Sequence, residues 1–182
     1  MVPRKIRLGA QSAALTLALV GSAVTAVPLA HAQTSASVPA SFVTVTGDGW
    51  TIMGPPDWTL TTLGSGIQQL KGNYPDGVGG AITVIHTAVP GDYQLATFLS
   101  DFQGSDAMKG ATLGQAQSAT WRNQPASVGD YTGQTGMGGY NLWLEKGQAW
   151  AIIGTVFTTD KTVMQNDSGA IGPALLTFNI AQ

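Results

Sequence analysis

Residues 140–157, YNLWLEKGQAWAIIGTVF, form two apolar runs on either side of the pair Lys146-Gly147. β-branched and aromatic residues are enriched in both runs, and a lysine-glycine pair suits a tight turn. This stretch therefore predicts two antiparallel strands joined by a short hairpin turn. Side chains alternate between the two faces of a strand. In the first run the apolar face carries Tyr140, Leu142 and Leu144, and the more polar face carries Asn141, Trp143 and Glu145.

Short β-prone runs separated by Gly, Asn, Pro and Asp continue on both sides of this hairpin. They include FVTVT (42–46), WTLTTLG (58–64), IQQLKGN (67–73), GAITVIHTAV (80–89) and TLGQAQSATW (112–121). Tight turns are predicted at GDG (47–49) and at RNQP (122–125). Strands linked by such turns indicate hairpins rather than alternating strands and helices, and they favour an antiparallel sheet.

The segment GWTIMGPPDWTL, residues 49–60, places two tryptophans on either side of a proline pair. Proline cannot donate to a strand ladder, so Pro55 and Pro56 are expected at a strand end or a sheet edge. Trp50 shares a face with Ile52, where a core needs bulk. We therefore expect Trp50 and Trp58 to form a hairpin and the corner that seals it, rather than a ligand platform.

Two segments have helical periodicity. In residues 92–103 the apolar positions Leu95, Phe98, Leu99 and Phe102 recur at helical spacing, with Asp92 as a candidate cap and Gly104 as the end. Residues 160–178 indicate a broken helical stretch, with Pro173 in the first turn of a short last helix. Strands in the middle and helices at two chain crossings predict an α+β fold.

The N-terminal segment has the features of a signal peptide. A basic start is followed by an apolar stretch, and Ala30 and Ala32 fit the recognition pattern of a signal peptidase. We predict a signal peptide over 1–32 with cleavage after Ala32, a flexible leader over 33–41 and one domain over 42–182. The alternative is a retained membrane anchor. The small residues Ala30 and Ala32 at the end of the apolar stretch favour cleavage instead.

The composition of the predicted mature chain excludes several functional classes. It has no cysteine, and three of the eight basic residues lie in the signal peptide, which leaves five against ten acidic residues and a net charge of −5. So few basic residues predict no nucleic-acid partner, and no apolar run after the signal could span a membrane. We expect a soluble periplasmic or secreted protein.

The order of the motifs resembles that of the PsbP-like family, which includes an extrinsic protein of photosystem II and exported bacterial proteins of the DcrB type. The resemblance rests on an initial hairpin, a P-x-W corner (56–58), an amphipathic helix, an N-x-P-A turn (123–126), Y-x-L-x-L-x-x-G (140–147) and a terminal helix. It covers nearly all of the predicted mature chain but is one of layout, because each motif is short.

This resemblance implies an α/β/α sandwich around an antiparallel sheet of about six or seven strands, with two or three helices. It also implies a scaffold used mainly for binding and assembly. No catalytic motif shared by the family can be transferred to this chain, and no cofactor is expected.

The residues with functional potential are few. His86 is the only histidine after the signal, and it alternates with Ile82 and Val84 on one sheet face. A lone imidazole cannot build a structural metal site, so a structural role at a sheet end is favoured over a base or a ligand. Trp143 lies on the more polar face of its strand. We expect it to be exposed and, with His86, to be a possible ligand or partner contact.

Other motifs give weaker signals. Asp48, Asp57 and Asp76 all fall in loops and could supply a pair of catalytic carboxylates, although aspartate is also common in turns. The run GQTGMGG (133–139) lacks the lysine and the glycine spacing of a phosphate-binding loop, and is better interpreted as a hairpin loop.

These observations predict an exported, non-catalytic accessory or binding protein whose partner, a protein or a small molecule, lies outside the cytoplasm. Two alternatives remain open. One is a carbohydrate-binding module that uses exposed aromatic rings, and the other is a small extracellular hydrolase. A role as an enzyme is therefore undecided, with the balance against it.

Overall fold

The structure, a computed structural model, describes residues 37–74, 76–167 and 171–181. The predicted signal peptide, its cleavage site after Ala32 and the first residues of the predicted leader lie outside the described residues. Within the described part of the chain, no helix is both long enough and apolar enough to cross a membrane.

A small sheet of three strands begins the described chain, in the order β1-β2-β11. The strands β1 (Val43–Thr46) and β2 (Trp50–Gly54) form the predicted hairpin, and Gly49 has a φ of 76° in its turn. The third strand, β11 (Asn179–Ile180), pairs with β2 and was not predicted from the sequence. The small sheet therefore joins the two ends of the described chain.

Eight strands form the large sheet, in the order β3-β4-β5-β10-β9-β8-β6, with β7 paired to β8 beside β6. Every pairing in it is antiparallel. Its strands are β3 (Thr59–Gly64), β4 (Ile67–Asn73), β5 (Gly79–Ala88), β6 (Thr112–Leu113), β7 (Gln117–Trp121), β8 (Gln124–Thr132), β9 (Met137–Glu145) and β10 (Gln148–Val156). The predicted antiparallel sheet is confirmed. The proline pair, Pro55 and Pro56, lies in the segment between the end of β2 and the start of the edge strand β3.

Two hairpin turns position the central strands. Lys146 and Gly147, with φ angles of 54° and 72°, join β9 to β10, and Arg122 and Asn123, with φ angles of 52° and 64°, join β7 to β8. Two consecutive positive φ angles are typical of the type I′ turn, whose twist matches that of the strands it connects. The register that follows places Trp150 of β10 opposite both Trp143 of β9 and His86 of β5.

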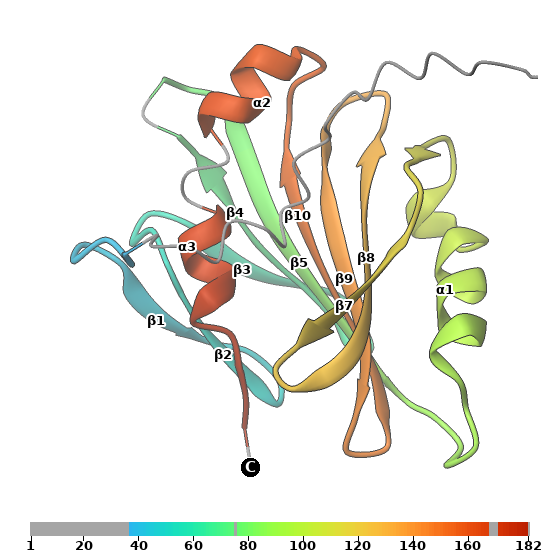
Figure 1. The fold of residues 1–182 in the computed structure, drawn as a ribbon. Coiled ribbons are helices and arrows are strands. Elements are labelled where there is room, and N and C mark those ends of the chain that lie inside the picture. The colour runs from blue at the N-terminus through green and yellow to red at the C-terminus, as the bar shows by residue number, and fades with distance from the viewer. Residues whose placement is uncertain (1–36, 75, 168–170, 182) are drawn as a thin grey trace, which may run out of the picture.

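Helices lie on both faces of the large sheet (Figure 1). Helix α1 (Leu95–Gln103), followed by the short 3₁₀ turn η2 (Asp106–Met108), packs on one face. The other face is covered by α3 (Ile171–Leu176) and by the small sheet, and α2 (Lys161–Asp167) precedes α3. The fold is therefore an α/β/α sandwich of the α+β class, as predicted.

The predicted apolar face of α1 contacts the sheet. Phe98 and Phe102 are buried against Tyr140 and its neighbours, while Leu95 and Leu99 are half-buried at the margin. The prediction that Asp92 caps this helix is wrong. The capping position lies two residues later, at Gln94, whose side chain makes no capping bond and instead donates to the Asp92 carbonyl.

A separate hydrophobic core lies on the other face of the large sheet, under α3 and the small sheet. It contains all five tryptophans, including Trp50 and Trp58. A β-carbon on Gly47 would lie 2.1 Å from the Trp50 ring, and one on Gly72 would lie 2.2 Å from the Trp58 ring. Each of these glycines therefore leaves the space that a ring occupies. The prediction that Trp50 and Trp58 form a structural hairpin and corner is confirmed.

Candidate functional site

Four aromatic rings, one each from β7, β9, β10 and β5, form a row on the face of the sheet opposite α1. We call it the aromatic row, and its members are Trp121, Trp143, Trp150 and His86. The Trp143 and Trp150 rings are stacked with centroids 6.1 Å apart, and His86 stacks on Trp150 at 4.8 Å. Trp121 extends the row beyond Trp143, also at 6.1 Å. The fold thus brings together both residues that the sequence singled out, with Trp150 between them.

The C-terminal segment covers this row. The ring of Phe178 meets Trp143 edge-on at 5.8 Å and Trp150 edge-on at 6.1 Å. The same ring stacks against Trp50 of the small sheet at 6.0 Å. Edge-to-face contacts of this kind stabilise aromatic pairs beyond the area they bury. Phe178 therefore packs between the small sheet and the large sheet and contacts both.

The expected exposure of Trp143 is wrong, since its side chain is 0% exposed. Its polar neighbours Asn141 and Glu145 indicated a solvated face, but that face is covered by the small sheet and by Phe178. Asn141 is itself 3% exposed, and Glu145 accepts a hydrogen bond from the Trp143 indole nitrogen at 3.1 Å. Polar residues on this face belong to a buried layer rather than to a surface.

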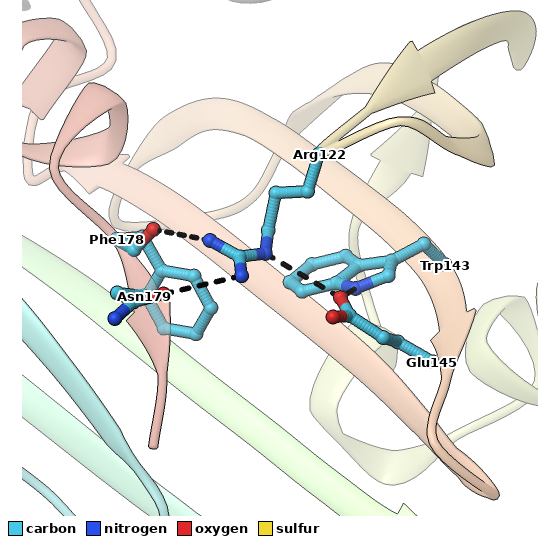
Figure 2. Close-up of polar contacts among 5 residues, drawn as sticks. All are labelled: Arg122, Trp143, Glu145, Phe178 and Asn179. Carbon is cyan, nitrogen blue, oxygen red and sulfur yellow. Dashed lines mark hydrogen bonds and ion pairs between the residues drawn. The ribbon is translucent and has the colours of Figure 1, made fainter. Parts of the chain in front are cut away.

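Arg122 clamps the C-terminal segment onto the sheet, as Figure 2 shows. Its Nη1 donates to the Phe178 carbonyl at 2.7 Å, and its Nη2 donates to Oδ1 of Asn179 at 3.3 Å. Its Nε donates to Oε2 of Glu145 at 3.4 Å, the same oxygen that accepts from Trp143. A fork of three contacts requires the planar guanidinium of arginine, which lysine cannot replace. We call this group the arginine clamp.

His86 ends the aromatic row at the opposite side. As predicted, it lies on the face of Ile82 and Val84, both of which belong to the core that contains Trp150. Its Nε2 lies 4.0 Å from Oδ2 of Asp48 and has no hydrogen-bond partner among the described residues. The Asp48 side chain is 79% exposed, so solvent screens this pair and it contributes little stability.

The three candidate loop carboxylates lie in exposed turns. Asp48, Asp57 and Asp76 are all exposed, and Asp76 accepts a hydrogen bond from the Val78 amide within its own turn. Across the ranges that the structure describes, no three His, Cys, Asp or Glu side chains are grouped so as to hold a metal ion. Of the candidates that the sequence suggested, His86 and Asp48 lie near one another.

Sequence reasoning identified Arg122 only as part of a turn and did not identify Phe178 at all. Arginine occurs only once after the predicted signal peptide, and that single occurrence was the available signal for Arg122. No local pattern indicates that Phe178 reaches the aromatic row, because the contact joins residues far apart in the sequence.

No model of a known protein family matches the sequence, and no curated protein sequence matches it. Solved structures do match the fold. The solution structure of cyanobacterial PsbP (CyanoP) from Synechocystis sp. PCC 6803 is 15% identical, with a TM-score of 0.54 over 78% of this chain and 94% of that chain.

Two further structures are similar at lower scores. A protein of unknown function from Pseudomonas aeruginosa, described as a putative regulator, is 12% identical with a TM-score of 0.47 over 72% of this chain and 94% of its own. A variant of the protein Mog1 is 13% identical with a TM-score of 0.46 over 78% of this chain and 95% of its own. With the CyanoP match, the layout that the motifs indicated is confirmed, and the chain has a PsbP-like fold.

Proposed function

We propose that this protein is an exported, non-catalytic accessory or binding protein that acts in the periplasm or outside the cell. The observation that carries the proposal is the placement of its reactive groups. The only histidine of the described chain stacks against Trp150, and the three loop aspartates lie in solvent. A general acid or base must lie within hydrogen-bond reach of a substrate, and the one pair among these groups, His86 and the 79% exposed Asp48, is 4.0 Å apart.

Export is supported by the sequence of residues 1–32, with its basic start, its apolar stretch and the small residues Ala30 and Ala32. The proposed mature protein begins at Gln33. Its surface is poor in charge, and its net charge of −5 leaves no basic patch for a nucleic acid.

The resemblance to PsbP-like proteins supports the same proposal, because that scaffold is known mainly for binding and assembly. The partner is a protein or a small molecule outside the cytoplasm. A carbohydrate platform of exposed rings is not supported, since each of the five tryptophans is at most 7% exposed. A hydrolase is not supported either, because the candidate carboxylates Asp48, Asp57 and Asp76 are exposed loop residues.

Two measurements test this proposal. The first is the N-terminus of the protein recovered from the outer compartment of an expressing bacterium, which should be Gln33. Full-length chain retained in the membrane would contradict export.

The second measurement is turnover of glycoside, ester and peptide substrates by the purified mature protein and by His86→Ala and Asp48→Asn variants. We expect that any turnover measured for the native protein will be the same in both variants. A true catalytic acid or base contributes about 10²- to 10⁴-fold in rate, so a loss of that size in either variant would establish an enzyme.

A further inference from the structure

The start of β9 is a glycine-rich segment that the proposed function does not explain. The loop GQTG (133–136) joins β8 to β9, and the strand continues as MGG (137–139). A β-carbon on Gly138 would lie 1.8 Å from the Gly154 carbonyl oxygen, and one on Gly136 would lie 2.9 Å from the Val156 carbonyl oxygen. These two positions therefore exclude any side chain, since real β-carbons do not approach backbone oxygens this closely.

Glycine at position 138 also leaves β9 without a side chain between its two neighbouring strands. Gly138 lies between Tyr131 of β8 and Thr155 of β10 in the register. Because no side chain separates them, the Tyr131 hydroxyl crosses β9 and forms a hydrogen bond with the Thr155 hydroxyl. Tyr131 is 9% exposed, and burial raises the pKa of its hydroxyl, which keeps the group protonated at ordinary pH.

A hollow of about 300 Å³ opens beside this pair. It is bounded by the segment after η2, by the β8–β9 loop and by the two hydroxyl-bearing residues, and its lining is Lys109, Gly110, Ala111, Tyr131, Gly133, Gln134, Thr135, Gly136 and Thr155. Its volume lies at the small end of the range for ligand pockets, which suits a molecule the size of a monosaccharide.

The charge of this hollow has one sign. Lys109 is its single ionisable cation, no carboxylate is part of the lining, and Lys109 has no ion pair within the described ranges. Hydroxyl groups from Tyr131, Thr135 and Thr155 and the amide of Gln134 complete the polar lining. These groups both donate and accept hydrogen bonds, as the hydroxyls of a ligand require.

We propose that this hollow binds a small hydroxy-carboxylate of the sugar-acid class, with Lys109 pairing with the carboxylate and the hydroxyl and amide groups binding the ligand hydroxyls. A lone lysine suits a single carboxylate. The lining contains no arginine fork and no helix start of the kind that commonly holds a phosphate. The site does not use the aromatic row, which is buried on the opposite face.

A second hollow, of about 220 Å³, lies at the β9–β10 turn but includes both Glu145 and Lys146. Its two charges have opposite signs, so it selects no anion. The difference in charge between the two hollows is the reason for assigning the ligand to the one at Lys109.

This inference rests on the binding role proposed above and names a ligand class for it. The experiment is a titration of the ¹⁵N-labelled mature protein with glucuronate, glucose and inorganic phosphate, followed by amide NMR shifts. We expect glucuronate to shift the amides of Gly110, Gly133 and Gly136, and neutral glucose to shift them much less. Lys109→Gln should weaken glucuronate binding about five- to tenfold, whereas Lys161→Gln, the same change on the exposed surface of α2, should leave it unchanged.

Three outcomes would overturn the inference: no shifts at millimolar glucuronate, equal binding by Lys109→Gln, or a response to phosphate that exceeds the response to glucuronate. A further variant, Thr155→Val, keeps the shape but removes one hydroxyl, and it should weaken glucuronate while leaving the fold intact. If the protein is exported and binds a protein partner but none of these ligands, the proposed function stands and only this inference fails.

Discussion

Strand β9 has two halves with opposite construction. From Tyr140 to Glu145 it carries large side chains on both faces, with Tyr140 under α1 and Trp143 in the aromatic row. From Met137 to Gly139 it is mostly glycine, and the side chains of its neighbours Tyr131 and Thr155 meet across it. Large side chains in one half join the three layers of the fold, whereas glycine in the other half allows the close approach of β10 and the contact between Tyr131 and Thr155. These two residues line the hollow at Lys109, together with the loop that precedes β9.

The largest expected effect comes from removing bulk in the aromatic half. Trp143→Ala should lower the free energy of unfolding by about 3–5 kcal/mol, because the ring is fully buried between Trp121, Trp150 and Phe178. Urea denaturation measures this loss. Thr61→Ala in the exposed edge strand β3 is the control and should change stability by less than about 0.5 kcal/mol.

A midpoint for Trp143→Ala that equals that of the native chain would mean that the aromatic row is not packed as described. Acrylamide quenching gives an independent check, because fluorescence from Trp143 should be shielded from the quencher. Efficient quenching of the Trp143 fluorescence would mean that this ring is exposed, as the sequence pattern indicated.

The glycine half is tested by adding a single methyl group. Gly138→Ala should cost about 1–3 kcal/mol, since its β-carbon would overlap the Gly154 carbonyl oxygen and force the two strands apart. Gly91→Ala, at a loop position where a β-carbon meets nothing within 4 Å, is the matched control and should be tolerated. If both changes are tolerated equally, then the close approach of β9 and β10 at this position does not require glycine.

The arginine clamp extends the aromatic half to the C-terminal segment. Arg122→Asn removes the clamp but retains a residue that accepts a positive φ, so the turn is preserved. We expect a loss of about 1–2 kcal/mol, because the Phe178 carbonyl and Glu145 lose a charged partner. Lys146→Asn makes the same change in the other type I′ turn, where the side chain is exposed, and should be nearly neutral.

Thermal unfolding of the two asparagine variants gives the comparison directly. Equal midpoints would mean that Arg122 acts only as a turn residue, as the sequence alone indicated. A selective loss in Arg122→Asn would place the clamp among the contacts that hold the C-terminal segment.

The sequence predicted those parts of the fold that depend on local pattern. Alternation in residues 140–157 predicted the central hairpin, and helical spacing from Leu95 to Phe102 predicted α1 and its buried face. The turn at Arg122-Asn123 was predicted from residue types that favour turns. In each case the determining residues lie within one turn or one strand of each other, so a single sequence contains the information.

The parts that could not be predicted depend on contacts between distant residues. The alternation around Trp143 was interpreted correctly as two faces, but a polar neighbour cannot show whether a face meets water or another layer. That layer includes β11 and Phe178, which are about 35 residues further along the chain. The predicted helix start was wrong for a different, local reason. Asp92 has the right chemistry for a cap, but the helix begins only after Gln94.

The smallest expected effect concerns Asp130 of β8, which pairs with Gly139 beside the glycine half. Burial raises the pKa of this carboxyl above its ordinary value, because the ionised form loses hydration. The folded state therefore holds the proton more tightly than the unfolded state does. Its contribution to stability is fully present below the unfolded pKa of about 3.9 and is lost as the pH rises through the folded pKa.

Asp130→Asn removes this ionisation, so the variant should be more stable than the native chain at pH 7. The difference should shrink as the pH is lowered through the range in which the native carboxyl becomes protonated. Urea denaturation of both proteins between pH 3 and pH 7 measures the difference, and Asp57→Asn in an exposed loop should change little at any of these pH values. A native chain more stable than Asp130→Asn at pH 7 would show that the carboxylate gains more from its contacts than burial costs it. In that case the surroundings of Asp130 would stabilise negative charge, and the folded pKa of this carboxyl would lie below its ordinary value rather than above it.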